Sequence, residues 1–169
     1  KIRLLDEAGN EVPSGEPGIL YMRGPHSPAG YWRDPEATRE SFKDGWLYTG
    51  DVGRLDAEGF LYIVDRKKDM IIRGGENIYC VEIENVLQSH PAVFEAAVVG
   101  EPDKVFGEQV MAYVVRNPGH SVTIDDILDY CEDHLADFKV PKYVRIVENL
   151  SRNTAGKIDK QALRRSAGS

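Results

Sequence analysis

Residues 81–115, VEIENVLQSHPAVFEAAVVGEPDKVFGEQVMAYVV, contain the pattern that decides the fold of this chain. Apolar side chains recur at helical spacing in VEIENVLQSH, and Pro91 ends this helix because its ring and missing N–H do not fit a helix interior. FEAAVVG and QVMAYVV are then apolar runs of strand length. A helix followed by two such strands predicts a small sheet that is covered by helices.

The pattern continues beyond these strands. An apolar stripe at helical spacing predicts a second helix, with Thr123 as its N-cap. The stripe consists of Ile124, Ile127, Leu128, Cys131 and Leu135. YVRIV, residues 143–147, reads as a further strand, and Asp159 is placed to cap a last helix through KQALRRS. We therefore expect residues 66–169 to form an α+β domain.

Residues 1–65 have a different character. KIRLL, GILYMRG and GFLYIVD are short strands rich in Ile, Leu, Tyr and Val, with Gly and Pro between them. PEATRESF predicts one short helix. The charged segment DRKKD separates the two halves, so we expect a domain boundary after Asp65. The chain begins without Met and inside a strand-like stretch, which we interpret as the sign of a fragment.

The composition is that of a soluble globular protein, 41% hydrophobic and 29% charged. No apolar run approaches the roughly 20 residues that span a bilayer, and no charged-then-apolar leader opens the chain, which predicts a cytoplasmic location. The net charge of −7 argues against nonspecific binding of nucleic acid. Cys80 and Cys131 are too few for a disulfide framework and lack the spacing of metal ligands, so we expect free thiols and no metal site.

One candidate site combines a carboxylate with an arginine. In GWLYTGDVG, Asp51 is expected at a strand end beside a flexible glycine, where a carboxylate can accept two hydrogen bonds from the vicinal diol of a ribose. Arg66 keeps its charge and offers a fork of donors that could hold ribose or phosphate oxygens near Asp51. Taken alone, each has a simpler interpretation: Asp51 in a β-turn and Arg66 as a solvated surface residue.

Two further segments are candidates for ligand contacts. Gly74 and Gly75 either allow a backbone to approach a ligand closely or form a tight turn. Lys157 lies in a loop of small residues and can reach an anion as a mobile point charge, although a surface lysine is the simpler interpretation. The sequence contains no GxxxxGK[ST] phosphate loop.

The order of four motifs favours the ligand-binding interpretation of these residues over the simpler one. The chain contains, in sequence, GILYMRGPHSPAGYW, GWLYTGDVG, DRKKDMIIRGGENIYCVEIE and NTAGKIDK. Together they resemble the C-terminal motif series of the adenylate-forming enzymes, a superfamily of acyl-CoA synthetases, luciferases and adenylation domains of peptide synthetases. The resemblance extends from residue 1 to about residue 165, and GGENIY with residues 81–115 is most similar to fatty-acyl or related acyl-CoA ligases.

The resemblance implies both an activity and an architecture. Members of the superfamily use ATP and Mg²⁺ to convert a carboxylate to acyl-AMP and pyrophosphate, and acyl-CoA synthetases then transfer the acyl group to the thiol of CoA. Residues 1–65 would be the end of the large AMP-binding domain, and residues 66–169 the mobile C-terminal lid domain. The partners implied are small molecules, namely a carboxylic acid, ATP and CoA. Long-chain substrates would bring the longer enzyme near a membrane.

The resemblance also implies roles for individual residues. Asp51 would hold the ribose hydroxyls of the adenylate, assisted by Arg66. Lys157 would contact the substrate carboxylate and phosphate during adenylation. Lys68 matches the hinge about which the lid rotates between the two half-reactions.

In the second half-reaction, the loop that contains Gly74 and Gly75 would line the pantetheine tunnel. The resemblance assigns no role to Arg73, and Lys67 is expected to be solvated.

Other features limit what this chain is expected to do alone. The pyrophosphate loop, the Mg²⁺ ligands, the adenine-binding segment and the acyl pocket of the superfamily would lie upstream of Lys1, so the chain alone is predicted not to adenylate. Cys80 stands where relatives often carry Pro, and Asn77 where some aryl-CoA ligases and luciferases carry Gln. Two alternatives are an adenylation domain that loads a carrier protein and a noncatalytic, stand-alone lid that binds a partner.

Overall fold

The computed structural model describes residues 1–167 and divides into two compact units, Lys1–Lys68 and Asp69–Ser169. The division falls after Lys68, whereas the sequence places it after Asp65. Two contacts explain this position. Arg66 is still the cross-strand partner of Asp51, and the amide of Lys67 donates to the carbonyl oxygen of Gly50 at 2.9 Å. The first part of the charged segment DRKKD therefore belongs to the first unit.

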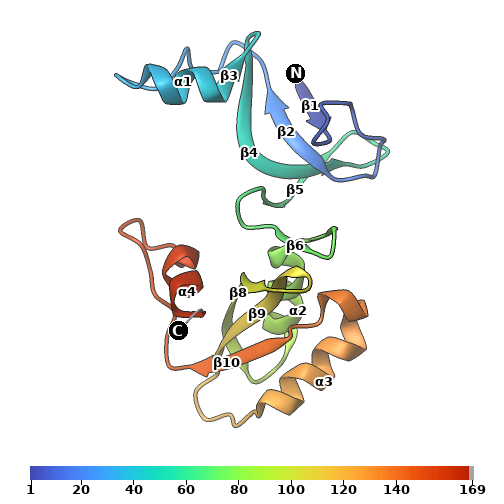
Figure 1. Cartoon of the computed structure of the whole chain (residues 1–169), viewed down its shortest axis with the longest axis vertical. Coiled ribbons are helices and arrows are strands. Elements are labelled where there is room, and N and C mark those ends of the chain that lie inside the picture. The colour runs from blue at the N-terminus through green and yellow to red at the C-terminus, as the bar shows by residue number, and fades with distance from the viewer. Residues whose placement is uncertain (168–169) are drawn as a thin grey trace. The chain divides into compact units, whose positions relative to one another are not determined.

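The first unit is a small antiparallel sheet with one short helix (Figure 1). Its elements are β1 (Ile2–Leu5), β2 (Gly18–Met22), α1 (Pro35–Ser41), β3 (Phe42–Lys43), β4 (Trp46–Leu55) and β5 (Leu61–Arg66). The strand order is β1-β2-β4-β3, and β5 also pairs with β4. Asp34 caps α1 by accepting from the amide of Ala37, and proline occupies the first turn. The predicted strands and the short helix are confirmed.

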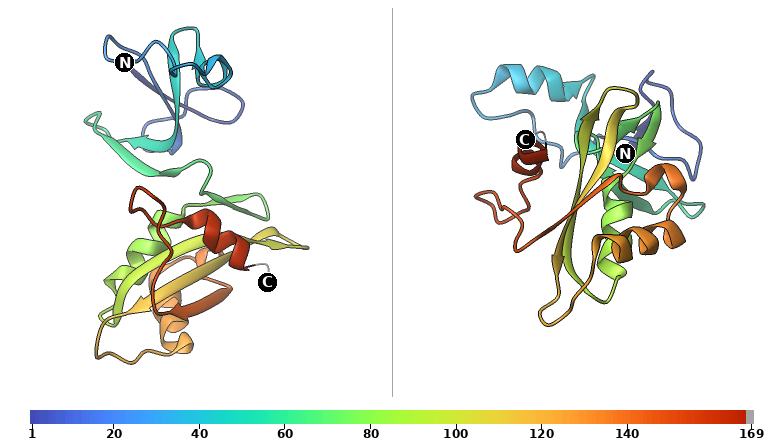
Figure 2. Two further views of the ribbon diagram at one scale, coloured as in Figure 1. Left: turned by 90° about the vertical axis from the view of Figure 1, so that its left-hand side faces the viewer. Right: turned by 60° about the horizontal axis from the view of Figure 1, so that its bottom comes forward.

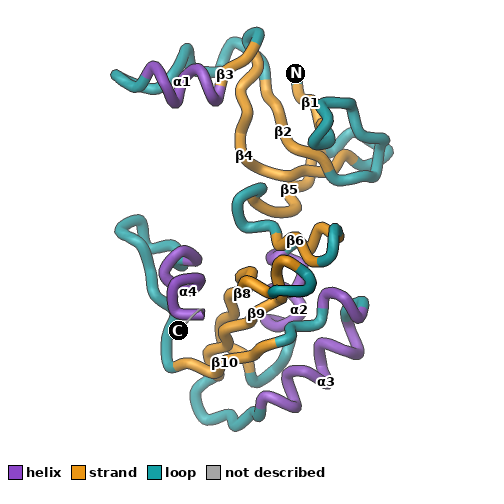
Figure 3. The backbone as a smooth tube through the Cα atoms, in the orientation of Figure 1, coloured by secondary structure: helices purple, strands orange, loops and turns teal. Residues whose placement is uncertain are grey.

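The long strand β4 organises this unit. Figure 3 shows it as a curved strand, and it pairs with β2, β3 and β5. The register shifts by a bulge between Val52 and Gly53 where β4 meets β5, and a bulge bends the strand that carries it. Leu4, Leu20 and Val52 form the buried apolar part of the unit within its described residues.

The second unit is the α+β domain that the sequence predicts. It contains β6 (Ile71–Arg73), β7 (Glu76–Ile78), α2 (Cys80–Ser89), β8 (Val93–Asp103), β9 (Gly107–Arg116), α3 (Ile124–His134), a 3-10 turn η1 (Asp137–Lys139), β10 (Tyr143–Val147) and α4 (Lys160–Ala167). β9 lies between β8, with which it pairs antiparallel, and β10, with which it pairs parallel. The β6–β7 hairpin joins β9 at one residue pair, Arg73 with Gly107.

Both faces of the β8–β9–β10 sheet are covered. α2 and α3 lie against one face and α4 against the other (Figure 2). Because successive side chains of a strand point to opposite faces, Val98 and Ala112 pack with α2 and α3. Ala97 and Met111 pack with Leu163 of α4. A strand that is buried on both faces is apolar at nearly every position, which explains the apolar runs AAVVG in β8 and VMAYVV in β9.

The helix ends follow the predicted signals. Thr123 and Asp126 form a capping box at the start of α3, in which each side chain accepts from the backbone of the other residue. Asp159 accepts from the amide of Ala162 at 3.0 Å and so caps α4. α2 ends at Ser89, before Pro91. These predictions are confirmed.

The two cysteines are free thiols in the core of the second unit. Cys80 donates from Sγ to the carbonyl oxygen of Asp69 at 2.9 Å. Burial raises the pKa of the Cys131 thiol to about 11, because the apolar surroundings disfavour the thiolate. Among residues 1–167, no helix is long and apolar enough to cross a membrane.

Candidate functional site

Asp51 and Arg66 meet on neighbouring strands of the first unit. They are cross-strand partners in β4 and β5, and Arg66 Nε lies 2.8 Å from Asp51 Oδ1. The backbone of Asp51 is also held, because its amide donates to Thr49 Oγ1 at 3.1 Å and that hydroxyl donates to the carbonyl oxygen of Leu20 at 2.9 Å. The structure thus brings together the two side chains that the sequence proposed as partners.

The expected location of Asp51 at a strand end is wrong. Asp51 lies within the ten residues of β4, because the ladder to β2 and β5 continues through Val52. Gly50 adopts a φ of +75°, in the left-handed region that favours glycine. The sequence signal of a strand end was this glycine, but the cross-strand pairing carries β4 past it.

The Asp51 carboxylate is suited to a ribose diol. Its Oδ1 is occupied by Arg66, and within the described part of the chain Oδ2 has no hydrogen-bond partner. A quarter of the Asp51 side chain is exposed, against about half of Arg66. An ionised carboxylate accepts through both oxygens, so Oδ2 is open to one hydroxyl and Oδ1 retains accepting capacity for a second. These residues therefore fit a nucleoside with free ribose hydroxyls.

Asp65 supports this pair, and sequence reasoning did not single it out. It is one of the buried polar side chains, 3% exposed, and its Oδ1 accepts from the amide of Arg66 at 2.7 Å. Its carboxylate therefore fixes the backbone from which Arg66 extends. The available signal was a lone acid at the end of the apolar strand LYIV, where a side chain pointing inward needs a partner.

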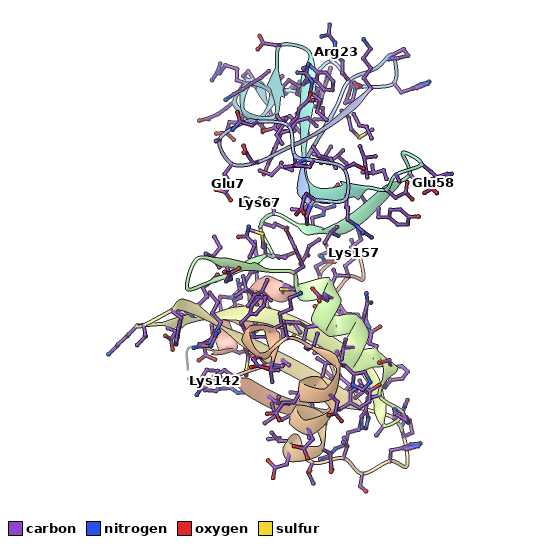
Figure 4. All side chains as sticks on the ribbon, turned by 90° about the vertical axis from the view of Figure 1, so that its right-hand side faces the viewer. Glu7, Arg23, Glu58, Lys67, Lys142 and Lys157 are labelled. Atoms are coloured by element: carbon purple, nitrogen blue, oxygen red, sulfur yellow. The ribbon has the colours of Figure 1, made fainter. Side chains whose placement is uncertain are left out.

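Lys67 is not solvated in the way that the sequence suggested. Its ammonium group forms an ion pair with Glu7, and its side chain is only 25% exposed. Figure 4 labels both residues and shows them close together. The expectation was wrong because Glu7 is 60 residues away in the chain, so no local pattern indicates it.

Gly74 and Gly75 form the two-residue turn between β6 and β7. Their φ angles are +60° and +91°, which L side chains adopt at a cost, so the turn favours glycine at both positions. The amide of Gly74 donates to the carbonyl oxygen of Phe106 at 2.8 Å. A Cβ atom on Gly74 would lie 3.3 Å from Phe106 Cδ1, whereas one on Gly75 would have no heavy atom within 4 Å. The Gly75 side of the turn is thus open.

Arg73, which the sequence left unassigned, ties this turn to β9. Its Nε donates to Gln109 Oε1 at 2.8 Å, and its guanidinium group lies 4.6 Å from the centre of the Phe106 ring. Gln109 is buried, at 5% exposure. Arg73 therefore stabilises the base of the glycine turn.

Lys157 projects from a loop whose backbone is closely held. Arg152 and Ile158 form an isolated β-bridge across the loop. Asn153 Oδ1 accepts from the amides of Ala155 and Lys157, at 3.0 and 3.1 Å. Within residues 1–167, Lys157 Nζ has no hydrogen bond or ion pair. An exposed ammonium group on a fixed backbone can reach an anion.

The predicted site residues are distributed over the two units. Asp51, Arg66 and Lys68 belong to the first, with Lys68 as its last residue, while Gly74, Gly75 and Lys157 belong to the second. In the part of the chain that the structure describes, no group of three or more His, Cys, Asp or Glu side chains could hold a metal ion.

The class of protein follows from a comparison of the sequence with known families. Residues 82–157 match the family of the AMP-binding enzyme C-terminal domain. The chain belongs to the adenylate-forming, or AMP-binding, enzymes, as its motif series predicts.

Individual relatives agree with this assignment. A long-chain-fatty-acid–CoA ligase from Yersinia pestis is 47% identical over 163 residues, which are 96% of this chain and 29% of the relative. ATP-bound MatB from Rhodopseudomonas palustris has a TM-score of 0.91 at 42% identity, covering 98% of this chain and 33% of that protein.

A third relative is the o-succinylbenzoate CoA synthetase MenE from Bacillus subtilis, in complex with the acyl-adenylate intermediate OSB-AMP. It has a TM-score of 0.90 at 41% identity, covering 97% of this chain and 33% of that protein. The chain thus spans about a third of the length of the relatives that it matches.

Proposed function

We propose that this chain is part of an ATP-dependent acyl-CoA synthetase. Such an enzyme converts a carboxylate and ATP to acyl-AMP and pyrophosphate, and then acyl-AMP and CoA to acyl-CoA and AMP. The observation that carries the proposal is the Asp51 carboxylate, which Arg66 holds at 2.8 Å and which keeps an oxygen open to a ribose hydroxyl. Similarity across both units to an acyl-adenylate complex supports it.

In the first half-reaction, three side chains act on the nucleotide and the acid. Asp51 accepts from the ribose hydroxyls, while Arg66, with Nε 2.8 Å from Oδ1, holds that carboxylate in its orientation. Negative charge develops on the carboxylate and α-phosphate oxygens in the transition state, and the Lys157 ammonium group stabilises it. Mg²⁺, held by ligands outside this chain, would neutralise charge on the phosphates.

In the second half-reaction, the lysine must give way to a passage for the thiol of CoA. Lys68, at the end of the first unit, is the proposed hinge for this exchange. The Gly74–Gly75 turn is the proposed lining of the pantetheine tunnel, because glycines leave room for a narrow chain. Its open Gly75 side supports this role.

A fatty or related acyl acid is the proposed substrate. The long-chain-fatty-acid–CoA ligase supports this class, and the o-succinylbenzoate CoA synthetase indicates an aryl acid as the competitor. ATP–pyrophosphate exchange with a panel of fatty and aryl acids, run on the longer enzyme that contains this chain, separates the two. Faster exchange with aryl than with fatty acids would contradict the proposed class. Exchange by the 169-residue chain alone would contradict its expected inactivity.

The proposed role of Lys157 gives the sharpest test. In the longer enzyme, Lys157→Ala is expected to slow acyl-AMP formation by about 10²-fold or more, the scale of losing one preorganised charge-stabilising group. Thioester formation from supplied acyl-AMP is expected to remain. Pyrophosphate release and acyl-CoA formation measure the two steps separately.

The control is Lys104→Ala, which removes another exposed lysine of the same unit and should leave adenylation unchanged. Equal loss of both half-reactions in Lys157→Ala would contradict the proposed role. A holo carrier protein is offered in parallel with CoA, and a preference for the carrier would contradict the choice of CoA as acceptor.

A further inference from the structure

The loop that presents Lys157 depends on a second cation, Arg152. Its guanidinium group makes two contacts: NH2 with Glu95 Oε1 at 2.6 Å and NH1 with the carbonyl oxygen of Gly156 at 3.0 Å. Glu95 belongs to β8, so the first contact reaches the sheet. The second lies on the residue that directly precedes Lys157.

The contact with Gly156 acts on the peptide bond that leads into Lys157. The carbonyl of Gly156 and the amide of Lys157 belong to one planar peptide unit. Arg152 donates to the carbonyl, and the amide donates to Asn153 Oδ1 at 3.1 Å. Both polar ends of this unit are therefore held by side chains. The carbonyl oxygen of Lys157 in turn accepts from the amide of Asn153 at 2.8 Å. With the peptide planes on both sides of Lys157 held, the direction in which its side chain leaves the backbone is fixed.

The contact with Glu95 anchors this arrangement to a rigid element. Glu95 pairs with Val115 in the β8–β9 ladder, and its side chain is only 21% exposed. The guanidinium fork is planar, so one Arg152 side chain couples the sheet to the loop in a single orientation. A lysine in its place could reach one of these partners as a point charge but would not align both.

We propose that Arg152 is a positioning residue for adenylation, which orients Lys157 by coupling the Gly156 carbonyl to Glu95 of β8. The proposal rests on the proposed function, because it assigns Lys157 to the adenylation step. About half of the Arg152 side chain is exposed, and exposed ion pairs contribute little to stability. Removal of the Arg152 side chain should therefore slow one half-reaction and change the stability of the fold little.

The kinetic test uses the longer enzyme and three variants. Arg152→Ala is expected to slow acyl-AMP formation by about 10- to 100-fold, the scale of a small misplacement of a reacting group, with thioester formation from supplied acyl-AMP unchanged. Glu95→Gln should show a smaller loss of the same kind. Arg152→Lys should lie between Arg152→Ala and the unmodified enzyme. The matched control is Lys139→Met, which removes the 2.7 Å ion pair with Glu82 elsewhere in this unit and should affect neither step.

A second measurement does not depend on activity. Hydrogen exchange of the Lys157 amide, followed by NMR in the 169-residue chain, should become severalfold faster in Arg152→Ala and remain unchanged in Lys139→Met. A purely stabilising role would instead speed exchange throughout β8 and β9.

The outcomes separate the two proposals. If Lys157→Ala adenylates normally, the proposed function of this site fails. If Lys157→Ala loses adenylation but Arg152→Ala keeps it, the positioning role alone is overturned. Equal slowing of both half-reactions in Arg152→Ala, or an unchanged exchange rate at Lys157, would also overturn it.

Discussion

The cations between Arg66 and Arg73 bind several separate partners rather than one anion. Arg66 pairs with Asp51, Lys67 with Glu7, and Arg73 with Gln109 and the ring of Phe106. The charges of Arg66 and Lys67 are thus neutralised by carboxylates within the fold, whereas the partners of Arg73 are uncharged. Arg66 is the member whose partner also suits a nucleotide, because Asp51 keeps an oxygen open.

At the residue scale, the glycine turn yields a prediction with a matched control. Gly75→Ala places a Cβ atom at a φ of +91° in open space, so the cost is conformational and about 1 kcal/mol in the free energy of unfolding. Urea denaturation of the 169-residue chain measures it. Gly119→Ala, at φ +79° and also in open space, should cost a similar amount.

The two glycines should differ in function. In the longer enzyme, Gly75→Leu is expected to slow acyl transfer from acyl-AMP to CoA, because its bulk enters the proposed tunnel, while acyl-AMP formation continues. Gly119→Leu should change neither rate. An unchanged CoA step in Gly75→Leu would remove this turn from the tunnel.

At the scale of the elements, one side chain protects the outer strand of the sheet. Glu84 of α2 accepts from the amide of Val98 in β8 at 2.8 Å and pairs with Lys160 of α4 at 2.8 Å. An exposed strand edge is a template for pairing with another chain, and the Glu84 carboxylate satisfies one of its donors. The same ion pair holds α4 to α2 across the edge of β8.

The capping box of α3 yields a prediction for stability and its pH dependence. Thr123→Ala is expected to lower the free energy of unfolding by about 1 kcal/mol through loss of the cap.

The same capping box affects the titration of Asp126. Hydrogen bonds from Thr123 lower the pKa of Asp126 below its ordinary value of 3.8; the amide has the larger effect and the hydroxyl the smaller one. A lowered pKa in the folded state means that the ionised Asp126 stabilises the fold above about pH 4 and loses this effect as the pH falls through the folded value.

Denaturation of the 169-residue chain between about pH 2.5 and 7, a range that includes the ordinary pKa of aspartate, measures this effect. The difference in stability between the unmodified chain and Asp126→Ala should be largest near neutral pH and shrink below about pH 4. A difference that is constant over the whole range would show that the charge of Asp126 does not support the cap.

For the whole molecule, the division after Lys68 sets the expected behaviour. The two-sided core of apolar side chains lies in the second unit, whereas Leu4, Leu20 and Val52 are the buried apolar side chains of the first among the described residues. The first unit contributes the proposed ribose site, and the second the proposed lysine and glycine turn. If the lysine and the glycine turn act in different half-reactions, the second unit must rotate, and the proposed pivot is Lys68.

Lys68→Pro tests this requirement. Proline fixes φ near −65° and removes the backbone N–H, so the rotation between half-reactions is expected to slow. In the longer enzyme, steady-state turnover to acyl-CoA should fall, while a single turnover of acyl-AMP formation is retained. Lys68→Ala keeps the freedom of φ and should retain turnover. Normal turnover in Lys68→Pro would contradict the hinge.

The sequence by itself determined the elements and the family. Apolar periodicity, the Thr123 and Asp159 caps and Pro91 are local signals, and they placed α2, α3 and α4 and the strands of the sheet. The order of four motifs identified the adenylate-forming enzymes. These features could be predicted from the sequence because each depends on residues that are close together in the chain.

Only the tertiary structure showed which side chains pair across long stretches of the chain without a motif to indicate it. Lys67 pairs with Glu7 across 60 residues, and Arg152 with Glu95 across 57. The position of Asp51 inside β4 follows from cross-strand register, which the apolar run Trp46–Tyr48 does not contain. The physical reason is that a hydrogen bond or an ion pair depends on distance in space. The folding of the strands sets that distance, and no pattern within a segment encodes it.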